Sequence, residues 1–325
     1  MKREIIFFAL AALGLASCNG GFKKGEGGLL YNVHIDKGGP TIKEGDFLSV
    51  NVIAKTDADS VLFSTYELGH PSLMIMRKPQ NKGDVLAGLK LLADGDSATI
   101  KTNIDSTTPK GGQKPPFKGK YIVYEIKVEK VIAKGNLSDE VFKGRLDAYL
   151  KTQSDADKKA EPEKIKKYIA DNNLKVTTTA SGLDYVINTE GTGPKPAVGD
   201  TVAVYYVGKF TSGKVFDTNI KSEAQKAKMP INPMNPYKPL RFALGVAGMI
   251  QGWNEAFPLF SKGTKATLIL PSSLGYGDKG SQQIPGFTPL VFEVELVDII
   301  HPNPNAPKPV VTVPPSAQLR QPAKN

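Results

Sequence analysis

The stretch Leu290-Val291-Phe292-Glu293-Val294-Glu295-Leu296 alternates apolar and polar side chains, which predicts a strand that buries one face. Ala266, Leu268 and Leu270 alternate in the same way and predict a second strand of this kind. Residues 249–256 are predicted to form a short helix. Strands with one apolar face beside a short helix indicate a mixed α+β domain.

Seven short blocks around these elements stand in one order along the chain. They are Val204-Tyr205-Tyr206-Val207-Gly208, Gly213-Lys214-Val215-Phe216-Asp217, Phe242-Ala243-Leu244-Gly245, Met249-Ile250-Gln251-Gly252-Trp253, Leu274-Gly275-Tyr276-Gly277, Ile284-Pro285 and the stretch quoted above. In order and spacing they resemble the FKBP family of peptidyl-prolyl cis-trans isomerases. The resemblance implies an antiparallel sheet wrapped over one short helix, with an active site for X-Pro isomerisation between them.

The implied reaction is rotation about an X-Pro peptide bond, which requires no acid, base, metal or cofactor. The planar amide loses its resonance when it twists, and the barrier is about 18 to 20 kcal/mol. The twisted amide has less charge separation than the planar one, so a dry aromatic pocket favours it over the ground state. Lowering the barrier by about 5 kcal/mol accelerates rotation several thousand-fold. We therefore expect apolar walls, few converging polar groups and no cofactor.

The resemblance assigns individual residues to the pocket. Trp253 forms the floor on which the proline ring lies. The walls are Tyr206, Phe216, Phe242, Met249, Ile250 and Phe292, with Leu240 where the family usually has an aromatic residue. Tyr276 and the backbone of Ile284 hydrogen-bond the peptide carbonyls, and Asp217 at the rim interacts with the twisted amide. The residues alone leave two alternatives open, with Asp217 as a turn cap and Trp253 as an ordinary core residue.

Several features depart from the family pattern and leave the substrate preference open. Leu240 replaces the usual aromatic wall, and Met249 stands where a β-branched aliphatic residue is usual. Residues 220–238 form a longer segment than in minimal family members. The basic residue that commonly follows the rim aspartate is not clearly placed, and Lys221 is a candidate.

Residues 29–134 are predicted to form a degenerate domain of the same kind. Both halves of the chain carry Gly-Asp before a first alternating strand, a short strand that ends in Phe, and a long final alternating strand. Ser64, however, follows Phe63 where an aspartate is expected, and Leu89 follows Gly88 in place of the tryptophan. The pocket is therefore expected to be lost, which leaves a sheet that could bind unfolded chains or pack against the other domain.

Residues 135–175 are predicted to be a linker made of two helices. Ser138 provides the N-cap of the first helix and is followed by two acidic residues. The second helix is expected to start near Pro162, because a missing N–H costs little in a first turn. The isomerase domain is then expected over residues 176–301. The tail over residues 302–325 is rich in Pro and poor in large apolar side chains, so it is predicted to be disordered.

Residues 1–18 predict a signal peptide, because a basic start precedes an apolar run too short to span a bilayer. The run ends Leu15-Ala16-Ser17-Cys18, which resembles a bacterial lipobox, so Cys18 is expected to be acylated. The glycine-rich residues 19–28 are expected to form a flexible tether. We therefore expect a lipid-anchored envelope protein. The periplasmic face of the outer membrane is favoured, because no acidic run follows the cysteine.

The composition argues against several other functions. The net charge of +10 comes from scattered lysines without a dense basic block, so no nucleic-acid partner is indicated. Residues 275–280 match the G-x-G-x-x-G pattern, but prolines follow too soon for the helix that dinucleotide binding requires. The histidines stand alone in the sequence and predict no metal site.

The expected function is X-Pro isomerisation in exported proteins, with unfolded or partly folded proline-containing polypeptides as substrates and macrolides as inhibitors the pocket could accept. The alternative is a binding module or holdase that keeps the fold without turnover. Asp217, Tyr276 and Trp253 together favour catalysis in the second domain. The loss of their counterparts favours binding in the first.

Overall fold

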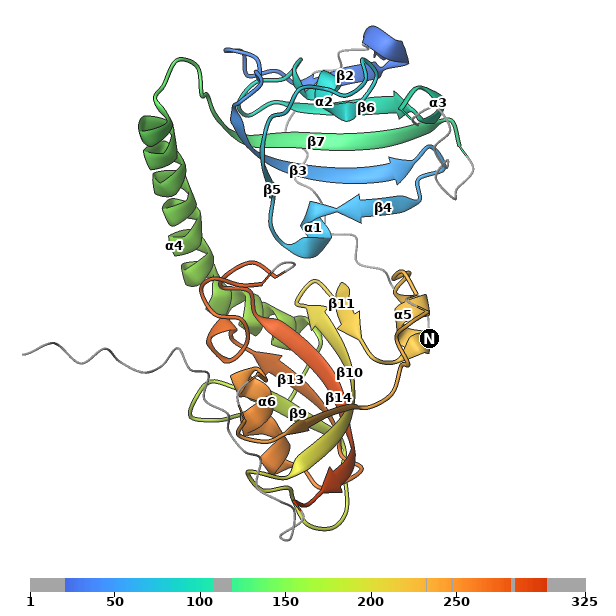
Figure 1. Ribbon diagram of the computed structural model, residues 1–325, viewed down its shortest axis with the longest axis vertical. Coiled ribbons are helices and arrows are strands. Elements are labelled where there is room, and N and C mark those ends of the chain that lie inside the picture. The colour runs from blue at the N-terminus through green and yellow to red at the C-terminus, as the bar shows by residue number, and fades with distance from the viewer. Residues whose placement is uncertain (1–20, 108–118, 232, 247, 282–283, 303–325) are drawn as a thin grey trace, which may run out of the picture. The chain divides into compact units, whose positions relative to one another are not determined.

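The computed structural model describes residues 21–107, 119–231, 233–246, 248–281 and 284–302 (Figure 1). The chain divides into two compact units, residues 1–156 and 157–325, each with its own sheet. The predicted signal peptide, the lipidation site Cys18 and the tail from residue 303 lie outside the described residues. Within the described ranges, no helix combines the length and the apolar character needed to cross a membrane.

The first unit is built on a seven-stranded sheet in the order β1-β2-β6-β7-β3-β4, with β5 also paired to β3. Its strands are β1 (Lys23–Lys24), β2 (Leu30–Ile35), β3 (Phe47–Thr56), β4 (Val61–Ser64), β5 (Ser72–Ile75), β6 (Ser97–Asn103) and β7 (Tyr121–Ile132). Its short helices are η1 (Glu26–Gly28), α1 (Thr65–Leu68), α2 (Val85–Leu89) and α3 (Ile104–Thr107). These strand pairs are antiparallel. Leu89 of α2 joins Leu48, Ile100 and Val128 of the sheet in one buried core.

Residues 23–28 lie at the edge of this sheet, so the flexible tether predicted over residues 19–28 is wrong for them. Two lysines pair with β2 as strand β1. Gly27 approaches the backbone of Gly83 so closely that a Cβ atom at position 27 would clash. The glycines that suggested flexibility thus permit a close backbone contact and a left-handed turn.

The second unit is built on a seven-stranded sheet in the order β11-β10-β14-β13-β9-β8, with β12 paired to β10. Its strands are β8 (Thr177–Thr178), β9 (Asp184–Thr189), β10 (Thr201–Phe210), β11 (Val215–Thr218), β12 (Leu240–Ala243), β13 (Lys265–Leu270) and β14 (Leu290–Ile300). The helices are α5 (Lys221–Lys226), α6 (Gln251–Ala256), η2 (Phe257–Leu259) and η3 (Ser272–Leu274). All these strand pairs are antiparallel, so the predicted α+β architecture is confirmed for both units.

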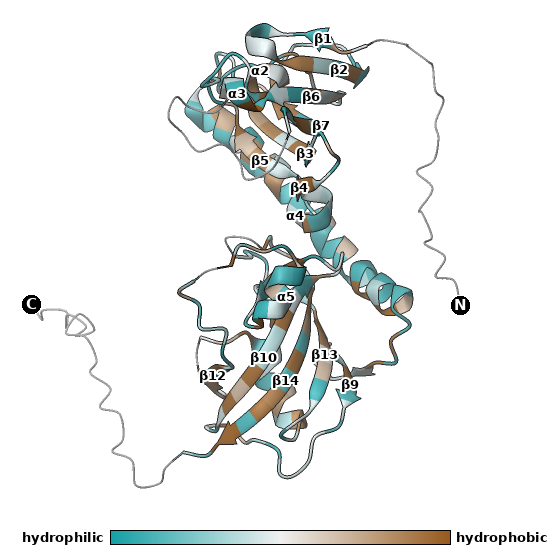
Figure 2. Ribbon diagram, turned by 90° about the vertical axis from the view of Figure 1, so that its right-hand side faces the viewer, coloured by the Kyte–Doolittle hydropathy of each residue, from teal (hydrophilic) through white to brown (hydrophobic). Residues whose placement is uncertain are grey.

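The core of the second unit follows the predicted pattern with one difference. Strand β14 contains the quoted stretch and alternates between hydrophobic and hydrophilic residues, as Figure 2 shows. The predicted helix over residues 249–256 is α6, which begins at Gln251. In β13, however, Thr267 and Ile269 are only 8% and 0% exposed, so this strand is buried on both faces rather than on one.

A single helix, α4 (Asp139–Asp171), replaces the two helices predicted for the linker. Pro162 lies inside it rather than at a start, so the two-helix prediction is wrong. Because the boundary between the units falls at residue 157, α4 contributes to both. In the first unit, Tyr149 of α4 packs edge-on against Phe47, with ring centroids 5.7 Å apart.

The predicted tandem repeat is visible in the details of both sheets. The order β2-β6-β7-β3-β4 matches β9-β13-β14-β10-β11 strand for strand. The first long strand of each unit has a register shift at the matching place, between Ala54 and Lys55 and between Gly208 and Lys209. Buried Asp46 and Asp200 each accept an N–H from the residue three positions earlier, at 2.8 Å. Each unit can therefore serve as an internal reference for the other.

Candidate active site

A cluster of aromatic rings surrounds Trp253, which is 2% exposed. Its ring centroid lies 5.2 Å from Tyr206, 5.3 Å from Phe292, 5.5 Å from Phe257 and 5.6 Å from Phe242. Most of these pairs are edge-to-face, the geometry that aromatic quadrupoles favour. The indole N–H has no hydrogen-bond partner among the described residues, so packing of the rings holds the tryptophan.

Five separate elements bring the predicted aromatic residues together. The rings come from β10 (Tyr206), β11 (Phe216), β12 (Phe242), α6 (Trp253) and β14 (Phe292). The ring of Phe216 lies 5.8 Å from that of Phe292 and joins the cluster from the sheet edge. The cluster therefore lies where the edge of the sheet meets the short helix.

Two glycines make this arrangement possible. A Cβ atom at Gly208 would lie 2.7 Å from Cζ of Phe216 and 3.0 Å from Cε1 of Phe292, so glycine leaves room for both rings. A Cβ atom at Gly252 would clash with the Leu270 side chain, so glycine lets α6 approach β13 and buries the neighbouring Trp253. Gly208 belongs to one of the sequence blocks, but the reason for a glycine there is visible only from the positions of the two rings.

A phenol and a carboxylate form the polar part of the site. The Tyr206 hydroxyl donates a hydrogen bond of 2.6 Å to Oδ2 of Asp217. Burial, followed by the nearby Asp217 carboxylate, raises the pKa of Tyr206 far above its ordinary value. The pKa of Tyr276 is raised for the same two reasons, and this side chain remains 39% exposed. Both phenols are therefore protonated donors near neutral pH.

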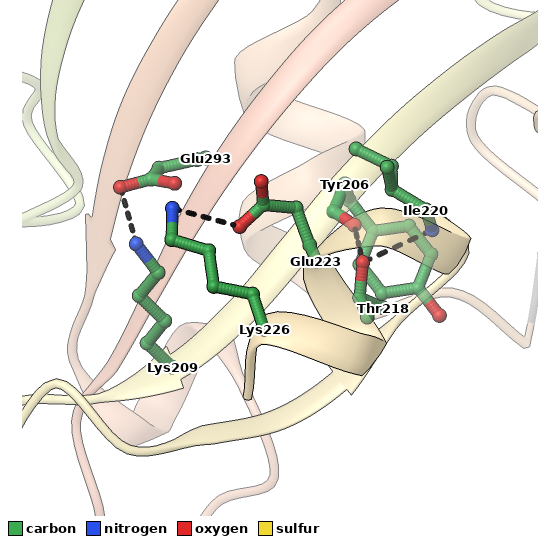
Figure 3. Close-up of polar contacts among 7 residues, drawn as sticks. All are labelled: Tyr206, Lys209, Thr218, Ile220, Glu223, Lys226 and Glu293. Atoms are coloured by element: carbon green, nitrogen blue, oxygen red, sulfur yellow. Dashed lines mark hydrogen bonds and ion pairs between the residues drawn. The ribbon is translucent and has the colours of Figure 1, made fainter. Parts of the chain in front are cut away.

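The backbone of Tyr206 is held by two residues that the sequence did not single out. Thr218 donates to the Tyr206 carbonyl at 2.6 Å and accepts from Ile220 N–H at 3.1 Å (Figure 3). Asn219 accepts the Tyr206 N–H at 2.9 Å. Thr218 thus caps the turn after β11. The Asp217 carboxylate accepts from Tyr206, so Asp217 is not the residue that caps this turn.

The remaining predicted residues differ in burial. Leu240 begins β12 and is 37% exposed, and Met249 and Ile250 are half-buried before α6. Ile284 is buried, and its backbone, which is predicted to bond a peptide carbonyl, exchanges two hydrogen bonds with Ser281: the Ile284 N–H donates at 3.3 Å and the Ile284 carbonyl accepts at 2.6 Å. Lys221 is exposed at the start of α5.

Among its described residues, the first unit has no counterpart of the Tyr206–Asp217 pair, although one alignment in the prediction was wrong by one residue. In the second unit Asp217 pairs with Gly208, and in the first Phe63 pairs with Ala54. Phe63, rather than Ser64, therefore occupies the position of the rim aspartate. Ser64 is buried and caps α1 by accepting Glu67 N–H.

The fold and the site define an α+β protein with a cluster of aromatic rings between an antiparallel sheet and a short helix, and comparison with known proteins identifies its family. The family described as FKBP-type peptidyl-prolyl cis-trans isomerase matches residues 193–297. A probable FKBP-type peptidyl-prolyl cis-trans isomerase of Haemophilus influenzae is 31% identical over 224 residues, covering 68% of this chain and 81% of that protein. The chain belongs to the FKBP-type peptidyl-prolyl cis-trans isomerase family, as its sequence blocks predicted.

Two other relatives each match half of the chain or less. FkpA of Aeromonas hydrophila is 34% identical over 163 residues, which cover 50% of this chain and 55% of that protein. The 22 kDa FKBP-type isomerase of Escherichia coli is 38% identical over 137 residues, which cover 41% and 59%. The chain therefore spans little more than half the length of these two relatives. The crystal structure of Escherichia coli FkpA is 31% identical, with coverage of 51% of this chain and 74% of that one and a TM-score of 0.40.

Proposed function

We propose that residues 176–301 catalyse cis-trans isomerisation of X-Pro bonds in unfolded or partly folded polypeptides. The observation that carries this proposal is the Tyr206–Asp217 hydrogen bond of 2.6 Å beside the ring cluster around Trp253. It combines an apolar surface for proline with one fixed polar pair. Membership of the isomerase family supports the same activity.

In the proposed mechanism the pocket favours the twisted amide over the planar one. The proline ring lies on Trp253, and the rings of Phe216 and Phe292 exclude water from the peptide bond. Loss of resonance reduces the charge separation of the amide, so leaving water costs the twisted state less than the planar state. Asp217, oriented by Tyr206, interacts with the twisted amide, and Tyr276 donates to a peptide carbonyl. No step requires a cofactor.

The decisive test compares turnover with binding in the full chain. Asp217→Val should lower the rate of prolyl-peptide isomerisation while leaving most of the affinity, because an interaction used in the transition state affects turnover more than binding. Asp298→Val is the matched control, since Asp298 is a strand carboxylate paired with Lys262 at the surface. A wild-type chain that binds prolyl peptides but never accelerates isomerisation would establish the alternative of a holdase without turnover.

We further propose that the chain acts in the cell envelope as a lipoprotein anchored through Cys18, on the periplasmic face of the outer membrane, with exported proteins as substrates. This proposal rests on the lipobox-like residues 15–18. The Cys18→Ala variant is expected to be lost from the membrane fraction after a high-salt wash. Macrolides such as rapamycin are proposed inhibitors, because an apolar pocket that accepts proline could accept their pipecolate-like ring.

A different observation favours binding without turnover in the first unit. Apolar side chains on the edge strands β4 and β5 are 41% to 49% exposed: Val61, Leu62, Phe63, Leu73 and Ile75. Edge strands with exposed apolar residues are able to add an extended chain. We propose that this edge binds extended apolar polypeptides. Leu62→Glu with Phe63→Glu should reduce suppression of aggregation by the full chain while short prolyl peptides are isomerised at the wild-type rate.

A further inference from the structure

Glu161 stands out on α4 because it is a buried carboxylate, 9% exposed, among exposed charged neighbours. Both of its oxygens bind one residue of the second unit. Oε1 accepts the backbone N–H of Ser272, and Oε2 accepts the Ser272 hydroxyl at 2.9 Å. A carboxylate is rarely buried unless such bonds replace its water. The two bonds therefore fix Ser272 to this point of the helix.

Ser272 in turn holds the segment that carries Tyr276. It begins η3, directly after β13 and Pro271. Its carbonyl accepts the N–H groups of Gly275 and Gly277, at 2.9 and 2.8 Å, on either side of Tyr276. An unbroken series of hydrogen bonds thus connects the Glu161 carboxylate to the backbone around the exposed phenol.

The same segment contacts the floor of the pocket. A Cβ atom at Gly252 would lie 3.2 Å from the carbonyl oxygen of Leu274, the last residue of η3. Gly252 directly precedes Trp253, so a shift of η3 would alter the support of both the rim and the floor. Pocket geometry is sensitive to such shifts, since misplacement by about 1 Å can cost about a hundredfold in rate.

Glu161 directly precedes a proline inside α4, which is locally unfavourable for a helix. A residue before proline is disfavoured in the α-helical region, and Pro162 follows Glu161 within α4. Pro162 also lacks the N–H that would bond the preceding turn. Residue 161 is nevertheless helical, and its side chain makes the two bonds to Ser272 at this point of α4.

We propose that Glu161 is a positioning residue for the candidate site, acting through Ser272 to place Tyr276 at the rim. This inference rests on the proposed function, because it assigns Tyr276 to the bound peptide. It also extends the functional isomerase unit into α4, beyond the start predicted at residue 176. The division of the chain at residue 157 places Glu161 in the second unit, as the proposal requires.

The test is a double-mutant cycle in the full chain with Glu161→Ala, Tyr276→Phe and both together. The probe is an Ala-Leu-Pro-Phe peptide, for which kcat and KM are measured. Glu161→Ala should raise KM about tenfold, and the double variant should be little worse than Tyr276→Phe, because the two residues act on one interaction. Glu163→Ala is the matched control, since Glu163 is exposed on the same helix and pairs with Lys166.

Conservative variants separate positioning from general destabilisation. Glu161→Gln should restore nearly the wild-type KM, because its amide oxygen can accept the Ser272 N–H while its NH2 donates to the hydroxyl. If Glu161→Ala does not fold, Ser272→Ala replaces it in the cycle. A wild-type KM in a folded Glu161→Ala variant, or additive effects in the cycle, would overturn the proposal.

A binding measurement distinguishes this proposal from the proposed function. Trp253 is the only tryptophan in the chain, so its fluorescence reports peptide binding at the pocket without turnover. If the wild-type chain binds the peptide but does not isomerise it, the proposed function fails. The double-mutant cycle is then evaluated from the Kd values of the peptide for the four chains. Non-additive changes in Kd would then still support positioning by Glu161, and additive changes would exclude it.

Discussion

The two units share one sheet order, but the described part of the first unit does not contain the ring cluster of the second. Strand order, the matching register shift and the buried aspartate before the first long strand are common to both. In the second unit the Tyr206 N–H donates to the Asn219 side chain. At the matching place in the first unit, the Val52 N–H donates to the Thr65 hydroxyl. The scaffold is therefore separable from the chemistry, which depends on a few side chains placed on it.

The difference between Ala54 and Gly208 is one part of this separation. Gly208 leaves room for the rings of Phe216 and Phe292, which a Cβ atom would contact at 2.7 and 3.0 Å. In the first unit Ala54 pairs with Tyr124 at the corresponding register. The first unit has Leu62 at the position of Phe216, one residue before Phe63 in β4, and Leu62 is 44% exposed. The first unit therefore differs from the second both in the small residue and in the ring that lies beside it.

The largest effect should come from removing the centre of the cluster. Trp253→Ala should cost about 3 to 5 kcal/mol of unfolding free energy and abolish prolyl-peptide binding, because it leaves a large cavity in the floor. Urea unfolding followed by circular dichroism and peptide titration measure the two effects. Leu89→Ala, in the buried core of the first unit, is the control and should destabilise that unit without reducing isomerase activity. Wild-type peptide affinity in Trp253→Ala would contradict the pocket assignment.

The second prediction exchanges the two small residues between the units. Gly208→Ala should destabilise the second unit by about 1 to 3 kcal/mol through overpacking, and kcat/KM for a prolyl peptide should fall. The reciprocal Ala54→Gly should cost about 0.5 to 1 kcal/mol in the first unit and create no activity, because the other pocket groups are missing. Full activity in a folded Gly208→Ala chain would show that the two rings do not need this space.

Much of the fold and the aromatic pocket could be predicted because the signals are local. The alternation of residues 290–296 and the block containing Trp253 depend on neighbours in sequence. The roles of Gly208 and Glu161 could not be predicted, since Gly208 depends in part on Phe292 and Glu161 depends on Ser272, both far along the chain. The single helix also escaped prediction, because Pro162 is locally unfavourable inside a helix and the contact of Glu161 with Ser272 is not visible in the local sequence.

The third prediction isolates the polar pair that the first unit lacks. Tyr206→Phe keeps the ring but removes the hydroxyl that donates to Asp217. A hydrogen bond to a charged group contributes about 1.5 to 3 kcal/mol, so kcat should fall about tenfold or more while peptide affinity changes little. Tyr205→Phe, one residue away on the opposite side of the strand, should have no effect. Equal rates for the two variants would remove the polar pair from the mechanism.

The smallest predicted effect concerns the buried aspartates, whose partners differ between the units. Asp200 accepts Ala197 N–H and the ring Nδ1 of His301, whereas Asp46 accepts backbone N–H groups of Lys43 and Lys134. The Ala197 N–H, followed by His301, lowers the pKa of Asp200 below its ordinary value.

A carboxyl group with a lowered folded-state pKa stabilises the fold above its unfolded pKa of about 3.9, and the contribution is lost as pH falls through the lower folded value. Asp200→Asn should therefore make the stability of the second unit less dependent on pH below about 4. The dependence should not disappear, because Lys262 also lowers the pKa of Asp298. Urea unfolding followed by Trp253 fluorescence from pH 5 to pH 2 reports this unit alone, since the first unit contains no tryptophan. An unchanged slope in Asp200→Asn would show that the aspartate contributes to the turn without contributing to acid sensitivity.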